Sequence, residues 1–305
     1  MRFTKAQATG NDFVMVSDRE AQIELSPKDV SRLCDRHLGV GADGVIRAVP
    51  AHKSTPGQVA LTEAELTSTD EIPLWFMDYR NGDGSEAEMC GNGVRAFAHY
   101  LEAENHIELA EGESIPVLTR AGLRTVRKVE EGYAVGMGVW SFIDPEMASE
   151  SASDSLVRAT GLTDPRPALS ISMGNPHTVV ALPDEATLEK LDLHYAPIVD
   201  PTPPHGTNVE FVVPADPLVE NNQGRVQMRV HERGVGETLS CGTGTCAAAA
   251  AVRVWAGADA VDTWTVTVPG GEVTVRFTAR TDGAEDVELA GPAVLVYSGD
   301  ISLKQ

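Results

Sequence analysis

The chain lacks most features that mark secreted or membrane-spanning proteins. Four cysteines among 305 residues are too few for the disulfide framework of a small secreted protein. No apolar run approaches the roughly 18 residues that a membrane-spanning helix needs. The first residues alternate like a strand and do not have the form of a signal peptide. We therefore expect a globular protein of the reducing cytoplasm with no membrane association.

Basic residues and cofactor motifs are also scarce. Lys and Arg total 24 against 45 Asp and Glu, and the net charge of −21 argues against binding to nucleic acid or to anionic membranes. The histidines do not cluster, and the cysteines lack the paired spacing of a zinc site. The glycine-rich stretch Gly39–Gly44 does not match a phosphate-binding loop, and no Lys-centred pyridoxal motif is present. We expect neither metal nor cofactor.

Two short motifs far apart in the chain carry the strongest chemical signal. Met89–Arg95 reads MCGNGVR and Ser240–Cys246 reads SCGTGTC, and each is followed by a run that predicts a helix. A helix N-terminus offers bare N–H groups and positive potential, which can hold a carboxylate and should lower the pKa of Cys90 and Cys241. One free cysteine is more often a small buried hydrophobe. Two such motifs in one chain favour chemistry.

The two halves of the chain resemble each other. A length of 305 residues favours two domains. Gly10–Val16 is similar to Gly174–Val180, and Cys90 and Cys241 follow these segments in the same order. This pattern indicates a duplicated domain, with coincidence between glycine turns as the alternative. A pseudo-twofold pair would bring the two helix N-termini together at the domain interface, where ligand sites concentrate.

Most other segments predict short strands, but three have different expectations. Ser26 and Pro27 predict a helix start, and the helix should run to about His37 with Cys34 in its buried face. The segment 50–73 loses its apolar pattern and predicts an exposed, partly mobile insertion. Ser149–Ser155 has low complexity and predicts a solvated loop.

Two thiols on either side of a cleft suit one reaction particularly well. Inverting a stereocentre by proton transfer needs a base on one face of the carbon and an acid on the other. One cysteine as thiolate and one as thiol can fill these roles and exchange them when the reaction reverses. Helix N-termini can stabilise the negative charge that develops on a substrate carboxylate.

With these residues assembled, the whole chain resembles the diaminopimelate epimerase family. The resemblance is carried by Gly10–Phe13, Asp78–Asn81, Asp83–Ser85, Cys90–Arg95, Met173–His177, Asn208–Glu210, Glu232–Gly234, Gly236–Thr238 and Cys241–Gly244. It implies cofactor-independent interconversion of LL- and meso-2,6-diaminopimelate, for lysine and peptidoglycan precursor synthesis, by an enzyme that is commonly a homodimer. It also implies an α/β fold of two similar pseudo-twofold-related domains. Each should be a curled, mostly antiparallel sheet around a central helix, with the active site in the cleft. We expect the domains at 1–132 plus 293–305 and at 133–292.

The resemblance also assigns roles to individual residues. Cys90 and Cys241 resemble the acid/base pair, and His177 and Glu232 the residues that set the thiol pKa values. The residues that resemble substrate-binding positions are Asn11, Asn81, Gly91, Asn92, Asn175, Asn208, Glu232, Arg233, Gly242 and Thr243. Among them, Arg233 suits the distal carboxylate because its planar fork can engage both oxygens.

Two departures from the family and two competing interpretations remain. Many family members carry glutamine at the position of Gly44, and the segment Ala51–Glu71 is longer than the family needs. A proline-type racemase shares the two-thiol logic but more usually has His where Asn92 stands. A non-catalytic redox or binding protein would use Cys90 and Cys241 as a disulfide pair.

Overall fold

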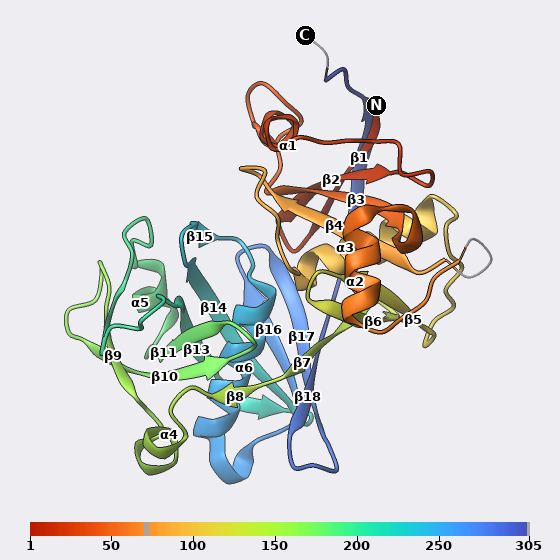
Figure 1. Cartoon of the computed structure of the whole chain (residues 1–305). Helices are drawn as coiled ribbons and strands as arrows, with labels where there is room; N and C mark the ends of the chain where they lie inside the picture. The colour runs from red at the N-terminus through yellow and green to blue at the C-terminus, as the bar shows by residue number, and fades with distance from the viewer. Residues whose placement is uncertain (70–72, 304–305) are drawn as a thin grey trace. The chain divides into compact units, whose positions relative to one another are not determined.

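The computed structural model describes residues 1–69 and 73–303, and the chain divides into two compact units (Figure 1). Unit 1 comprises Met1–Gly136 and Ala290–Gln305, and unit 2 comprises Met137–Leu289. Each unit combines a mixed, mostly antiparallel sheet with one long helix, which confirms the α/β class. Within the described ranges, no helix has both the length and the apolar character needed to cross a membrane.

The strands of unit 1 pair in a simple order. They are β1 (Arg2–Ala8), β2 (Asn11–Ser17), β3 (Gly44–Pro50), β4 (Trp75–Asn81), β5 (Ser114–Thr119), β6 (Gly122–Val129), β7 (Gly132–Val139) and β19 (Val294–Asp300). β2 pairs with β3, and β4 with β5, in parallel. The other neighbours, including β1 with β19, are antiparallel. The C-terminal strand therefore completes the sheet that the N-terminal strand begins.

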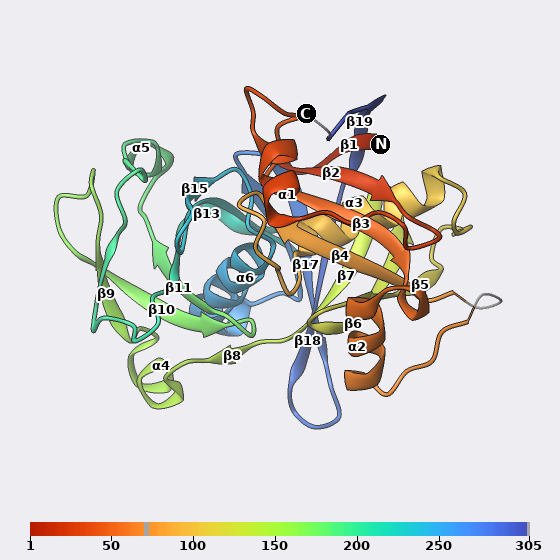
Figure 2. The ribbon, with the colours of Figure 1, turned by 45° about the horizontal axis from the view of Figure 1, so that its top comes forward.

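Helices cover both faces of the middle strands in unit 1. α3 (Gly91–Ala103) packs against β1, β2, β3 and β4 and buries most of its length. On the other face, α1 (Pro27–Cys34) packs against β3, and its buried residues cluster with Val14, Val16 and Val45 (Figure 2). Burial on both sides explains why β2 and β3 read as nearly continuous apolar runs.

The first helix ends earlier than expected. Ser26 caps α1, and Pro27 is its first residue, as the sequence predicted. The helix ends at Cys34 instead of His37 because Asp35 adopts an extended conformation. Its carboxylate accepts hydrogen bonds from the N–H groups of His37 and Leu38, both at 2.7 Å, which stabilises a turn in place of another helical turn. The expected burial of Cys34 is confirmed.

The expectation of an exposed insertion at 50–73 is wrong for most of its length. The short helix η1 (Ala51–Lys53) and α2 (Thr55–Glu63) follow β3 directly. Ala51, Ala60 and Leu61 are buried against Val49 and Phe76 and extend the core. A nine-residue helix is too short to give a clear apolar period, which is why the sequence concealed it. Residues 70–72 of this segment lie outside the described residues.

Unit 2 repeats the strand pattern of unit 1. Its strands are β8 (Ser141–Phe142), β9 (Ser155–Arg158), β10 (Arg166–Ser172), β11 (Pro176–Ala181), β12 (Ile198–Asp200), β13 (Asn208–Glu220), β14 (Gln223–Glu232), β15 (Gly236–Thr238), β16 (Thr263–Val268), β17 (Gly271–Ala279) and β18 (Glu285–Gly291). β10 pairs antiparallel with β11, and β11 pairs parallel with β13. β13 then pairs antiparallel with β14, β14 parallel with β16, and β16 antiparallel with β17. β1 to β6 follow the same alternation, which supports the expected duplication.

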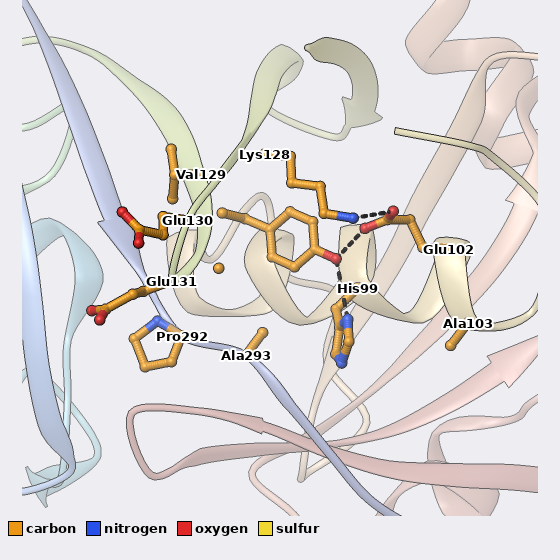
Figure 3. A pocket seen from close by; sticks show the side chains of 11 residues that line it. His99, Glu102, Ala103, Lys128, Val129, Glu130, Glu131, Pro292 and Ala293 are labelled. Atoms are coloured by element: carbon orange, nitrogen blue, oxygen red, sulfur yellow. Dashed lines mark hydrogen bonds and ion pairs between the residues drawn. The ribbon is translucent and has the colours of Figure 1, made fainter. Parts of the chain in front are cut away.

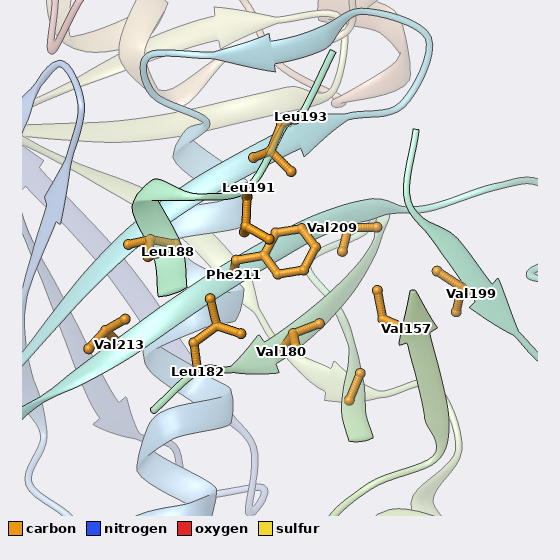
Figure 4. Close-up of a cluster of buried hydrophobic side chains, with 11 residues drawn as sticks. Val157, Val180, Leu182, Leu188, Leu191, Leu193, Val199, Val209, Phe211 and Val213 are labelled. Atoms are coloured by element: carbon orange, nitrogen blue, oxygen red, sulfur yellow. The ribbon is translucent and has the colours of Figure 1, made fainter. Parts of the chain in front are cut away.

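The helix α6 (Gly242–Ala256) is the centre of unit 2, and η2 (Gly257–Asp259) follows it. Its alanine-rich sequence lets β10, β11, β13 and β14 approach closely, and Ala247 to Ala251 are fully buried. A second cluster on β11 and β13 includes Val180, Phe211 and Leu188 of α5 (Glu185–Glu189) (Figure 4). Like β2, these strands are therefore buried on both faces.

The expectation of a solvated loop at Ser149–Ser155 is wrong at both ends of that segment. Residues 149–151 belong to α4 (Pro145–Ser151), and Ser155 begins β9. Asp144 caps the helix by accepting the N–H of Met147 at 3.0 Å. A serine-rich composition suggested a loop, but the preceding aspartate and proline are the stronger helix-start signals.

A half-buried histidine in unit 1 should make stability depend on pH. His106 stacks on Trp75 with ring centroids 4.5 Å apart, and its Nδ1 is buried without a hydrogen-bond partner among the described residues. Burial, with a smaller effect of Arg19, lowers its pKa from 6.5 to about 4. The unfolded chain therefore binds a proton that the folded chain does not, and stability falls as pH drops from about 6.5 towards about 4.

We expect His106→Gln to weaken this pH dependence. The side chain is only half-buried, so the discounted effect is about 1 kcal/mol between pH 7 and pH 5. Urea unfolding of both proteins at the two pH values measures it. Subtracting the two proteins removes the contribution of the many carboxylates. An identical loss of stability in wild type and variant would contradict the prediction.

Candidate active site

Cys90 lies immediately before α3 and caps its N-terminus. The thiol accepts the N–H of Gly93 at 3.4 Å, and the residue is half-buried. A Cβ at Gly93 would lie 2.9 Å from the end of the Met77 side chain, so the start of the helix packs closely against β4. The predicted turn from cysteine into helix is confirmed, since α3 begins at Gly91.

The amide side chains of Asn11 and Asn92 converge on this thiol. The Cys90 Sγ–H donates to Asn11 Oδ1 at 3.3 Å, and Asn92 Nδ2 lies 3.5 Å from the same oxygen. Asn92 is almost fully buried and accepts a hydrogen bond from Arg95 at 2.9 Å. Arg95 is itself fully buried and also donates to Thr9. The Asn92 side chain therefore supports the start of α3 from inside the unit.

A charged network behind Asn11 was missed in the sequence. Asn11 Nδ2 donates to Asp43 at 2.6 Å, and Arg36 donates to both Asp43 and Asp12. Lys5 pairs with Asp12 at 2.6 Å. Burial opposes the ionisation of Asp12, but Arg36 and Lys5 outweigh it and lower its pKa to about 2. The parallel pairing of β2 with β3 brings Arg36 and Asp43 to Lys5 and Asp12, which are about 30 residues earlier in the chain.

Asn81 and Gly44 lie opposite each other on β4 and β3. Asn81 donates to Ser85 at 3.0 Å and contacts neither Asn11 nor Cys90 through a hydrogen bond in the described part of the chain. A Cβ at Gly44 would lie 2.5 Å from the carbonyl oxygen of Arg80 and 2.6 Å from the Tyr79 ring. The glutamine that the family resemblance would lead one to expect here therefore does not fit this backbone.

Cys241 caps α6 as Cys90 caps α3. Its thiol accepts the N–H of Gly244 at 3.4 Å and lies 3.7 Å from the hydroxyl of Thr243. Burial raises the pKa of Cys241 well above its ordinary value, and the carboxylates of Glu232 and Glu210 raise it further. The expected lowering of this pKa is therefore wrong for Cys241, because burial and two acidic neighbours outweigh the helix N-terminus.

Asn175 and His177 connect Thr243 to a buried carboxylate. Asn175 Nδ2 donates to Thr243 at 3.4 Å, and Asn175 Oδ1 lies 3.1 Å from His177 Nε2. His177 Nδ1 is 2.7 Å from Glu210, and both side chains are fully buried. Both nitrogens of His177 thus face oxygens, which fixes the ring. Glu210 stands in the motif Asn208–Glu210, but its role was not anticipated.

The carboxylate of Glu232 lies close enough to the Cys241 thiol for each group to affect the pKa of the other. Burial raises the pKa of Glu232, and the charge of Glu210 adds to this, while hydrogen bonds from Thr238 and Cys241 oppose it. A carboxylate with a raised pKa beside a buried thiol is suited to accept and return a proton.

Asn208 and Arg233 form a separate pair in unit 2. Asn208 accepts the backbone N–H of Arg233 at 2.9 Å and donates to the carbonyl of Pro176 at 3.0 Å. The exposed guanidinium of Arg233 donates to the carbonyl of His205 at 2.7 Å. No acidic side chain of the described residues lies within ion-pair distance of it.

Comparison with known proteins identifies the family. The family model described as "Diaminopimelate epimerase" matches residues 3–143 and 169–296. The chain belongs to the diaminopimelate epimerase family. A diaminopimelate epimerase of Streptomyces coelicolor is 44% identical over 98% of this chain and 94% of that protein. One of Corynebacterium glutamicum is 39% identical over 99% and 98%.

Solved structures share the fold of this family member at low sequence identity. A PhzF-family phenazine biosynthesis protein of Bacillus anthracis has a TM-score of 0.67 at 16% identity and covers 99% of both chains. A probable proline racemase of Agrobacterium radiobacter has a TM-score of 0.60 at 13% identity, covering 99% of this chain and 93% of that one. These likenesses support the two-domain epimerase fold, and the proline-type alternative gains no advantage from them.

A hollow at the far end of α3 is distinct from the cysteine motif of this epimerase-family chain. Its volume is about 480 Å³, and its polar lining includes His99, Glu102, Lys128 and Tyr133 (Figure 3). Glu102 accepts from Lys128 at 2.7 Å and from the hydroxyl of Tyr133. These contacts fasten the last turn of α3 to β6 and β7. Cys90 lies at the opposite end of the same helix.

Proposed function

We propose that this chain epimerises LL-2,6-diaminopimelate to meso-2,6-diaminopimelate without a cofactor, using Cys90 and Cys241 as a two-base pair. The observation that carries the proposal is that a cysteine caps the central helix in both units. In a chain of this family, each unit places one cysteine at the N-terminus of its central helix. The proposed metabolic role is the supply of precursors for lysine and peptidoglycan.

The proposed reaction needs two proton carriers and a site for negative charge. One sulfur, as thiolate, removes the α-proton, and the other, as thiol, delivers a proton to the opposite face. Backbone N–H groups at the starts of the two helices stabilise the negative charge that develops on the substrate carboxylate. Gly91 and Asn92 supply these groups in one unit, and Gly242 and Thr243 supply them in the other.

Glu232 and His177 would adjust the protonation of Cys241. Because burial raises the pKa of this thiol, it needs an acceptor nearby before it can act as a base. Glu232 is near enough to this thiol for the two groups to influence each other's pKa, and we assign it as the acceptor of the thiol proton. His177, held by Glu210 and Asn175, keeps Thr243 beside the sulfur. In this proposal Glu232 moves the proton, and His177 fixes the surroundings.

Arg233 is the proposed anchor for the distal carboxylate of the substrate. Its guanidinium is exposed, and Asn208 holds its backbone in place. We assign Asn11, Asn81 and Asn175 to the remaining polar groups of the substrate, as the family resemblance implies. This arrangement would distinguish a substrate with two amino-acid ends from proline, which has no distal carboxylate.

Arg233→Lys should weaken binding more than folding. Lysine keeps the charge but loses the planar fork that holds both carboxylate oxygens. We expect KM for diaminopimelate to rise about tenfold, since the lost charge-assisted hydrogen bond contributes roughly 1.5 kcal/mol. Steady-state kinetics measures the change, and thermal unfolding shows whether the fold is intact. An unchanged KM would remove Arg233 from the substrate site.

Chiral analysis of the product tests the proposed function directly. The protein is incubated with LL-diaminopimelate, and the isomers are separated, with L-proline and trans-4-hydroxy-L-proline as competing substrates. We expect the meso isomer to accumulate and both proline compounds to remain unchanged. Conversion of a proline compound without conversion of diaminopimelate would favour the proline-type racemase.

We further propose that the enzyme is a cytoplasmic homodimer, as the family resemblance implies. Val294, Val296 and Tyr297 on β19 are exposed, which supplies an apolar surface for a second copy. Sedimentation velocity at micromolar concentration tests the association. A single monomer boundary across the concentration range would exclude it.

A further inference from the structure

Three side chains in unit 1 form a line that ends at a cysteine. Asn11 Nδ2 donates to Asp43 Oδ2 at 2.6 Å, and Cys90 Sγ donates to Asn11 Oδ1 at 3.3 Å. A carboxylate only accepts hydrogen bonds, so Asp43 requires the N–H₂ end of the amide to face it. The carbonyl end of Asn11 must then face Cys90.

The position of Asp43 is fixed by charges and by the backbone. Its Oδ2 also accepts the backbone N–H of Asp12 at 3.1 Å, and its Oδ1 accepts from Arg36 at 2.8 Å. The backbone N–H of Asp43 donates to Asp12 Oδ1 at 2.9 Å. Arg36 binds both oxygens of Asp12, and Lys5 binds one of them. These contacts leave the Asp43 carboxylate little freedom to turn away from Asn11.

We propose that Asp43 is a positioning residue that acts through Asn11 to hold Cys90 as a thiol before substrate binds. The inference rests on the proposed function, because it concerns the proton that Cys90 would deliver. An amide oxygen can accept the S–H of a thiol, but it repels a thiolate. Asp43 therefore favours the protonated form of Cys90 and directs its proton towards Asn11.

The second unit shows that this orientation is not a necessary feature of the repeat. Asn175 occupies the position in its repeat that Asn11 occupies in the first. Its carbonyl faces His177, and its N–H₂ end faces Thr243 on the cysteine side. The two asparagines are therefore oriented in opposite senses: the N–H₂ end of Asn11 faces Asp43, whereas that of Asn175 faces Thr243.

Several charged groups surround this line and must be separated from its effect. They are Lys5 on β1, Asp12 on β2, Arg36 after α1, Asp43 before β3 and Arg95 on α3. Removing any carboxylate here favours thiolate at Cys90 through the charge alone. Asp12→Asn is the matched control, because Asp12 carries the same charge in the same network without a side-chain contact to Asn11 in the described residues.

The test measures the alkylation of Cys90 by iodoacetamide across pH, without substrate, by peptide mass mapping. In Asp43→Asn the amide of Asn11 can turn its N–H₂ end to the sulfur. The alkylation rate at neutral pH should then rise about threefold beyond that of Asp12→Asn. In an Asn11→Ala background, Asp43→Asn should have no more effect than Asp12→Asn. The pH midpoint of Cys90 alkylation should also lie lower in Asp43→Asn than in Asp12→Asn.

Activity gives the second readout. The kcat/KM of Asp43→Asn for diaminopimelate should fall about tenfold, and Asn11→Ala with Asp43→Asn should be no worse than Asn11→Ala alone. If Asp43→Asn does not fold, Asp43→Ser replaces it, since serine cannot reach Asn11. Wild-type protein inactive on diaminopimelate would overturn the proposed function, whereas the alkylation of Cys90 still decides the role of Asp43. Equal alkylation in the Asp43 and Asp12 variants, or an Asp43 effect that persists without Asn11, overturns the inference.

Discussion

Cys241→Ala and Cys90→Ala should each lower kcat/KM for diaminopimelate by about 10³-fold or more, because one face of the α-carbon loses its proton carrier. Each cysteine caps a helix through a weak N–H to sulfur contact, at 3.4 Å in both units. Alanine at a cap costs about 1 kcal/mol of stability, so both variants should still fold. Stopped assays of isomer composition, with circular dichroism of each variant, measure the two effects.

Cys34→Ala is the matched control for the two cysteine variants. Cys34 is buried in the cluster around α1, and burial raises the pKa of its thiol to about 12. It should be chemically inert, and its replacement should reduce stability modestly while kcat stays within about twofold of wild type. Near-normal turnover in Cys90→Ala or Cys241→Ala would contradict the assignment. A folded but inactive Cys34→Ala would show that the wrong cysteine had been chosen.

Glu210→Ala should be the most destabilising of the substitutions considered in unit 2. Glu210 and His177 are both fully buried and 2.7 Å apart. Removing one partner of a buried pair leaves the other without its hydrogen bond, at a cost of about 3–5 kcal/mol. Urea unfolding should show this loss, and activity should fall as well because Thr243 and Cys241 lose their support. A change below about 1 kcal/mol would mean that the pair contributes little.

Glu237→Ala is the control for this prediction. Glu237 pairs with Arg229 at 2.7 Å, the same distance as in the buried pair, but both side chains are partly exposed. Water can solvate the arginine that remains, so the loss should stay within about 1 kcal/mol. Similar losses in the two variants would show that burial does not determine the strength of these contacts.

The sequence predicted the parts of the fold that depend on local signals. The Gly-x-Gly motifs predicted two helices that begin directly after Cys90 and Cys241, and the alternating segments predicted most strands. Composition and apolar periodicity misled where a core contact or a side-chain cap decided the outcome. The polar segment after Pro50 forms α2 because Ala60 and Leu61 find a place in the core, and α1 stops at Cys34 because the side chain of Asp35 caps a turn.

The site shows the same division between local and distant contacts. The motifs identified residues around the thiols, including Asn11, Asn175 and Glu232. They did not reveal Asp43 or Glu210, whose roles depend on the strand pairs β2–β3 and β11–β13. They also gave the wrong direction for the pKa of Cys241, because the burial of a thiol and its carboxylate neighbours are tertiary properties. The helix N-terminus depends on local sequence and could therefore be predicted.

Deuterium incorporation during one conversion tests the two-base proposal most directly. LL-diaminopimelate is incubated with the protein in heavy water, and substrate and product are separated early and analysed by mass spectrometry. Because one thiol removes the proton and a different, solvent-exchanged thiol delivers the new one, meso product should carry one deuterium at an α-carbon. Recovered LL substrate should carry none. Product that retains the original proton, or substrate labelled as fast as product, would contradict the two-base mechanism.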